Sequence, residues 1–195
     1  MVLREQRGIT GLETAIVLIA FVVVASVFAF AHLSTGLFAT DKAKETIKAG
    51  LSEARGTMEL KGSIIGTSTA TGSSGVLSSI TFQVTNAAAG EAVDLTPGNT
   101  ILRYFDDVQS KNYDGSSGAN FSITGMGNSD GDNLLERGEV YEITLQNLQS
   151  GGSDALDTEL GTDTQFTIEV IPPKGAVLYI QRTTPISFET INSLD

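Results

Sequence analysis

The segment from Asn128 to Glu139 has the residue spacing of a metal-binding loop. Its sequence, NSDGDNLLERGE, places oxygen-bearing side chains at positions 1, 3, 5, 9 and 12 and an apolar residue at position 8. In an EF-hand loop this order surrounds Ca²⁺ with hard oxygen ligands, and a terminal glutamate closes the site. Asn133 stands where that loop has its turn glycine, and an acidic turn that binds nothing is the alternative. The predicted ligands are Asp130, Asp132, Glu136 and Glu139.

A second candidate is a carboxylate at the start of an apolar stretch. Glu13 follows two basic residues, Arg4 and Arg7, and precedes residues 15–31, in which nothing is more polar than a serine. A carboxylate near a helix N-terminus is favoured by the helix dipole, and a buried charge needs a partner. The alternative is that Glu13 lies at the level of lipid headgroups.

Most other catalytic chemistry is missing from the sequence. The chain has no cysteine and one histidine, His32, which excludes thiolate nucleophiles, disulfides and multi-histidine metal sites. The formal net charge of −11 argues against binding to nucleic acid phosphates. Asp106 and Asp107 have no constellation of basic groups around them and are expected in a turn. We therefore expect a protein that is not an enzyme and that needs no cofactor except, in the calcium hypothesis, Ca²⁺.

Glu13 must be carried by a long helix. Residues 15–31 approach the length of about 20 apolar residues that spans a bilayer, and the preceding arginines favour a cytoplasmic N-terminus. Residues 40–60 are rich in Lys, Glu and Ala and carry an apolar seam at helical spacing. The pattern predicts one nearly continuous helix from about Thr10 to about Met58, with a kink at residues 34–36. The seam consists of Ile47, Leu51, Ala54 and Met58.

The candidate calcium loop belongs to a different kind of structure. After Lys61, apolar and polar residues alternate in segments such as SSITFQVTN, EVYEITLQNL and TQFTIEVIPP, which are rich in β-branched and aromatic residues. Turn-forming segments such as TPGN and DGSSG separate them. Seven or eight short strands without a second helix predict an antiparallel Ig-like β-sandwich. The fold class is α+β: a long hydrophobic N-terminal helix followed by this sandwich.

Three kinds of N-terminus fit these residues. A signal peptide would be cleaved after AFA, before His32; a permanent anchor would stay uncleaved; and a prepilin-type leader would be cut before the apolar run. The segments QRGITGLETAIVLIAFVVVASVFAFA and LSTGLFATDKAKETIKAGLSEARGTMELKGSIIG resemble the start of archaeal flagellins, over about 60 residues. These are filament subunits related to type IV pilins, with class III signal peptides.

The resemblance implies how the chain is processed. A prepilin-type leader peptidase of the membrane would recognise Arg7 and Gly8 and cut before Ile9. The implied parts are a cleaved leader, residues 1–8; a filament-core helix, residues 9–60; and an outer β-sandwich, residues 61–195. In the similar type IV pilins, a glutamate at the place of Glu13 helps to dock the incoming subunit. Flagellins of this family are commonly N-glycosylated, which makes Asn120 in the sequon NFS a candidate.

The resemblance also implies the function. The mature chain is expected to wait in the membrane and then join a homo-polymer, the extracellular filament of the archaellum, which motor and membrane assembly proteins rotate for swimming. A non-motile archaeal adhesion pilin is the nearest alternative. A membrane-anchored or secreted surface binding domain is the alternative from another class.

Overall fold

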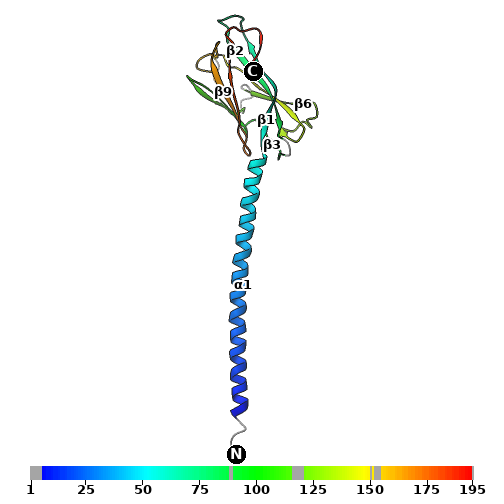
Figure 1. Ribbon diagram of the computed structural model, residues 1–195, viewed down its shortest axis with the longest axis vertical. Helices are drawn as coiled ribbons and strands as arrows, with labels where there is room; N and C mark the ends of the chain where they lie inside the picture. Colours follow the sequence, from blue (N-terminus) through cyan, green and yellow to red (C-terminus); the bar gives the residue numbers. More distant parts are fainter. Residues whose placement is uncertain (1–5, 88–89, 116–120, 150, 152–154, 195) are drawn as a thin grey trace, which may run out of the picture. The chain divides into compact units, whose positions relative to one another are not determined.

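The computed structural model describes residues 6–87, 90–115, 121–149, 151 and 155–194, with side chains from Gly11 onward except at residue 53. The chain forms two units, Met1–Ala49 and Gly50–Asp195. The first unit is helical throughout its described part. The second holds the end of the helix and every strand described (Figure 1).

The helix α1, Gln6–Arg55, is longer at its start and shorter at its end than expected. It ends at Arg55 because a glycine follows: the Gly56 N–H donates to Ser52 O (3.0 Å) and closes the last turn. The prediction that Met58 lies on the helical seam is wrong, because Met58 is the first, buried residue of β1. Residues 34–36, where a kink was expected, do not interrupt the helix, which is continuous through them.

The strands of the second unit form two main antiparallel sheets and one small one. The five-stranded sheet has the order β11 (Ile191–Ser193), β1 (Met58–Ser68), β2 (Leu77–Asn86), β8 (Val140–Leu145), β6 (Phe121–Met126). The four-stranded sheet has the order β10 (Leu178–Thr183), β9 (Gln165–Ile171), β4 (Ile101–Asp106), β5 (Ser110–Tyr113). A short pair joins β3 (Val93–Asp94) to β7 (Leu134–Leu135).

Alternation along these strands places one hydrophobic core between the two main sheets. Ile80, Phe82 and Val84 of β2 are buried on one side, and Leu102 and Tyr104 of β4 lie in the same core cluster. The residues between them point to the opposite face of their sheet, as strand geometry requires. The expected sandwich-like fold, a long helix followed by antiparallel sheets, is therefore confirmed.

Two glycines meet where the chain leaves the helix and enters the sandwich. Gly56 O accepts a hydrogen bond from Ala176 N (2.7 Å), in the turn between β9 and β10. Gly175 in that turn has a φ of 108°, and a Cβ built on it would lie 2.1 Å from Gly56 O. Only glycine allows this backbone contact, since it has no Cβ and adopts positive φ without strain.

Candidate functional site

The apolar part of α1 has no covering partner in its own unit. The large apolar side chains of residues 12–38 are between 54% and 75% exposed, with Phe30 the most exposed of them. Monomeric soluble proteins rarely expose a contiguous apolar surface of this kind, which instead marks contact with lipid or with other proteins. Residues Gly11–Ser52 are also long and apolar enough to cross a membrane, a test that a signal sequence would pass as well.

Most polar side chains in and just after this stretch bond to the backbone of the helix itself. Ser26 Oγ donates to Val23 O (2.8 Å), Thr35 Oγ1 to Ala31 O (2.9 Å) and Thr40 Oγ1 to Gly36 O (2.8 Å). His32 Nδ1 lies 3.0 Å from Phe28 O, so the imidazole is likewise bonded to its own helix. Because unpaired polar groups are costly in an apolar medium, these bonds fit the helix to surroundings without water.

Glu13 is the exception. Its side chain is exposed. Glu13 is the eighth residue of α1, which begins at Gln6. The first turn itself contains no acidic residue. Arg7, Gly8 and Ile9 lie in the helical backbone just before Glu13, and their side chains are outside the part of the chain that the structure describes. Removal of residues 1–8 would make Glu13 the fifth residue and bring it within about one turn of the new N-terminus.

The predicted calcium loop lies between β6 and β8, and one buried carboxylate organises it. Glu139 is 6% exposed. Its Oε1 accepts a hydrogen bond from Asp130 N (3.2 Å), and its Oε2 accepts one from Glu136 N (2.9 Å). Asp132 N donates to Asp130 Oδ1 (3.1 Å), and Leu134 N donates to Asp132 Oδ1 (2.8 Å).

The carboxylates of Asp130, Asp132 and Glu139 thus accept hydrogen bonds from the backbone of their own loop. Within the residues that the structure describes, no three histidine or acidic side chains gather so as to hold a metal ion. Tyr141 packs beside the loop, where its OH donates to Asp132 O and accepts from Ser129 Oγ (2.8 Å). Burial raises the pKa of Tyr141, and the charges of Glu139, Asp132 and Asp130 add to the shift. The calcium hypothesis stays a prediction.

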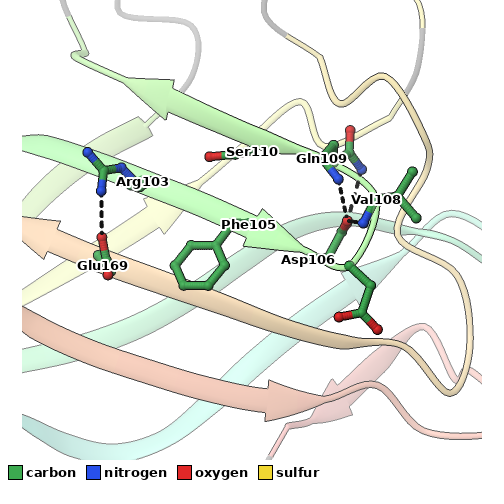
Figure 2. Close-up of a pocket in the computed structure, with 8 residues that line it drawn as sticks. Arg103, Phe105, Asp106, Val108, Gln109, Ser110 and Glu169 are labelled. Carbon is green, nitrogen blue, oxygen red and sulfur yellow. Dashed lines mark hydrogen bonds and ion pairs between the residues drawn. The ribbon is translucent and has the colours of Figure 1, made fainter.

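The two remaining candidates are a turn and a sequon. Asp106 Oδ1 accepts hydrogen bonds from Val108 N (2.8 Å) and Gln109 N (2.9 Å), and its Oδ2 accepts one from Gln109 Nε2 (3.1 Å) (Figure 2). Asp106 Oδ2 also accepts a hydrogen bond from Tyr104 OH (2.7 Å). Burial alone would raise the pKa of Asp106, but these hydrogen bonds hold it below its usual value. Asp106 thus closes the turn between β4 and β5. Asn120 lies outside the described residues.

Sequence reasoning missed two features of the sandwich. One is the contact between Gly56 and Gly175, for which the only signal was a glycine in the turn segment PPKG. The other is the exposed outer face of the four-stranded sheet, where Phe105 and Tyr179 form an aromatic pair. The alternation of apolar and polar residues around Phe105 and Tyr179 predicted strands there correctly, but it did not show which sheet each strand would join.

Comparison with protein families gives a match to the archaeal-type flagellin model over residues 8–182. A probable flagellin of Aeropyrum pernix is 35% identical over 209 residues, with 96% of this chain and 97% of the relative covered. A probable flagellin of Archaeoglobus fulgidus is 37% identical over 204 residues, with 96% of this chain and 94% of the relative covered. The chain therefore aligns with these relatives along nearly its whole length.

Two solved structures have a similar fold. A subunit of the archaeal flagellum of Methanospirillum hungatei superposes with a TM-score of 0.70 at 27% identity, and the match covers 95% of this chain and 99% of that one. The flagellin FlaB1 of Methanocaldococcus jannaschii gives a TM-score of 0.57 at 16% identity, over 70% of this chain and 95% of that one. The second likeness concerns the fold alone.

Proposed function

The chain belongs to the archaeal-type flagellin family, and we propose that its apolar helix is the segment through which copies polymerise. As a flagellin it is a structural subunit of the archaellum filament, an extracellular homo-polymer. We further propose that this filament is rotated for swimming, that a prepilin-type peptidase processes the chain, and that archaellum membrane and motor proteins assemble and drive it.

The observation that carries the polymerisation proposal is the exposure of α1. An apolar surface that runs along residues 12–38 would be covered by lipid in the precursor and by neighbouring helices in the filament. Contacts between different surfaces of identical subunits do not close, and they produce open helical assemblies. Dissociation into water would expose every such helix again, which makes the assembled state strongly favoured.

Cleavage between Gly8 and Ile9 is proposed to precede assembly. N-terminal sequencing of subunits purified from filaments tests this directly. Ile9 as the first residue is the expected result. His32 would instead indicate ordinary secretion, and Met1 or Val2 a permanent anchor, and either result would overturn the proposal.

Glu13 is proposed to dock the incoming subunit by pairing its carboxylate with the α-amino group that cleavage creates at Ile9. The reason is that a carboxylate transferred into an apolar helix bundle is costly unless it meets a positive partner. An amine at the neighbouring N-terminus is such a partner, and the helix dipole favours the same arrangement.

The docking role is tested by Glu13→Ala and Glu13→Gln, with Glu45→Ala as the matched control. Glu45 is an exposed glutamate of the same helix, paired only with Lys42 at the surface (2.7 Å). Both Glu13 variants should be cleaved normally and yield few or no filaments, while Glu45→Ala assembles. Normal filaments from Glu13→Ala would refute the docking role.

Calcium binding by the loop of residues 128–139 is proposed separately, on the spacing of its oxygens. Binding would require Asp130, Asp132 and Glu139 to exchange backbone hydrogen bonds for the ion, because they now accept such bonds. Thermal unfolding in chelator and after addition of calcium measures this. A midpoint that falls in chelator and recovers with calcium supports the site, and an unchanged midpoint removes it.

A further inference from the structure

The outer side of the four-stranded sheet carries a second exposed apolar surface, besides the one on α1. Leu102 and Val170, which lie opposite each other on β4 and β9, are buried in the core. The residues on either side of them along each strand therefore point outward. We name the outward apolar residues of this sheet, with the residue just before β10, the outer apolar face: Ile101, Phe105, Ile171, Val177 and Tyr179.

An aromatic pair organises this face. The rings of Phe105 on β4 and Tyr179 on β10 lie 6.4 Å apart between centroids, across the intervening strand β9. Figure 2 shows the Phe105 ring extending from β4 toward β9. Thr167 lies directly opposite Phe105 on β9 and is only 3% exposed, so its outward side chain is covered. Tyr179 nevertheless remains 55% exposed.

The two charged residues at the centre of the face pair with each other, and Asp106 and Asp107 lie at its edge, beside the turn between β4 and β5. Arg103 Nη1 donates to Glu169 Oε2 (3.2 Å), directly between the apolar residues (Figure 2). Arg103 Nε also donates to Asn112 Oδ1 (3.1 Å). The chain as a whole carries a formal net charge of −11. Like charges brought together across an interface are costly, so a face whose central charges are paired favours contact between copies of this chain.

The five-stranded sheet has a polar outer centre instead. Thr81 Oγ1 lies 3.1 Å from Thr144 Oγ1, and Gln83 Nε2 donates to Glu142 Oε2 (3.4 Å). The buried residues of the same two strands, such as Phe82 and Ile143, face the core. The two outer surfaces of the sandwich thus differ: one has a hydrogen-bonded polar centre, and the other is aromatic and aliphatic around one ion pair.

We propose that the outer apolar face is the surface through which the sandwich of one subunit contacts a neighbouring copy in the filament. The proposal rests on the filament function given above, because in a homo-polymer the neighbour of each subunit is another copy of this chain. Its composition fits: interface cores are rich in aromatic residues and arginine, and tyrosine is frequent among residues that dominate binding.

The absence of native cysteine allows a direct test by labelling. Tyr179→Cys and Ile101→Cys each place one thiol on the outer apolar face, and Thr144→Cys places one on the polar face as the matched control. In intact filaments we expect a maleimide reagent to label Cys at 179 and 101 at least tenfold more slowly than at 144. After dissociation in detergent, the three rates should become similar.

A photo-crosslinker attached to the thiol at position 179 before assembly identifies what covers the face. A product of twice the subunit mass supports the proposal, and a product with any other chain overturns it. Equal labelling rates at 179, 101 and 144 in intact filaments would overturn it too. If the wild-type chain itself is absent from filaments, the filament function fails as well, so the two failures are distinguishable.

Discussion

Replacing Gly175 by alanine tests whether the two-glycine contact limits the stability of the sandwich. The new Cβ would lie 2.1 Å from Gly56 O and 2.9 Å from Gly56 C, far inside van der Waals contact. The backbone there has a φ of 108°, which strains any residue with a side chain. Relief requires the turn to withdraw, and the hydrogen bond from Ala176 N to Gly56 O (2.7 Å) would be lost.

The expected loss of stability is the sum of these effects. An unfavourable backbone conformation costs about 1–3 kcal/mol, and the lost hydrogen bond contributes about 1 kcal/mol. Gly175→Ala should therefore lower the free energy of unfolding by about 2–4 kcal/mol, which in a domain of this size lowers Tm by roughly 4–16 °C. Thermal unfolding of the detergent-solubilised chain, followed by circular dichroism in the β-sheet region, measures it.

Two other glycines separate the causes. Gly72 has a φ of 97° with open space around its missing Cβ, so Gly72→Ala carries backbone strain without a clash. Gly161 has open space and no positive φ, so Gly161→Ala should leave Tm unchanged or slightly higher. The expected order of Tm is Gly161→Ala, then Gly72→Ala, then Gly175→Ala as the lowest. If Gly175→Ala and Gly72→Ala have the same Tm, the steric clash at Gly175 does not contribute.

Two further predictions concern the sandwich. Hydrogen bonds hold the pKa of Asp106 below its usual value of 3.8, so the unfolded state binds more protons near that pH. The stabilisation is therefore lost as pH falls from about 4 through the lower, folded-state pKa. The Tm difference between wild type and Asp106→Asn should shrink between pH 7 and pH 3, and a constant difference would contradict this. Phe82→Ala removes a side chain that is 1% exposed and should cost about 3–5 kcal/mol, whereas Val108→Ala, 74% exposed, should change the unfolding free energy measured in denaturant by less than about 0.5 kcal/mol.

The sequence predicted the sandwich well where alternation was strong. β8 lies inside the segment EVYEITLQNL, and β2 covers the segment SSITFQVTN and one residue before it, since burial on one face imposes a period of two on their side chains. The short strands β5 and β7 were not predicted, because four and two residues carry too little alternation to distinguish a strand from a turn. β5 is a strand because it pairs with β4, and β7 because it pairs with β3.

The end of the helix was misplaced for a related reason. Met58 continues the helical spacing of Ile47 and Leu51, but Gly56 ends α1 and Met58 becomes the first residue of β1. For the candidate calcium loop, too, the sequence predicted the position but not the local structure. Spacing located the loop of residues 128–139, yet it could not show that Glu139 is buried and accepts hydrogen bonds from the loop backbone. Such bonds depend on the loop conformation.

The hydrogen bonds of Ser26, Thr35 and Thr40 to their own helix have a consequence for the energetics of filament growth. Glu13 apart, a helix whose polar side chains bond to its own backbone is solvated about equally well by lipid chains and by apolar side chains of other helices. In lipid there is no hydrophobic force between such helices, so moving one from bilayer to filament changes its solvation free energy little. Growth and withdrawal of a subunit are then nearly balanced for this surface, and the direction of exchange is decided by the few contacts that differ between the two environments.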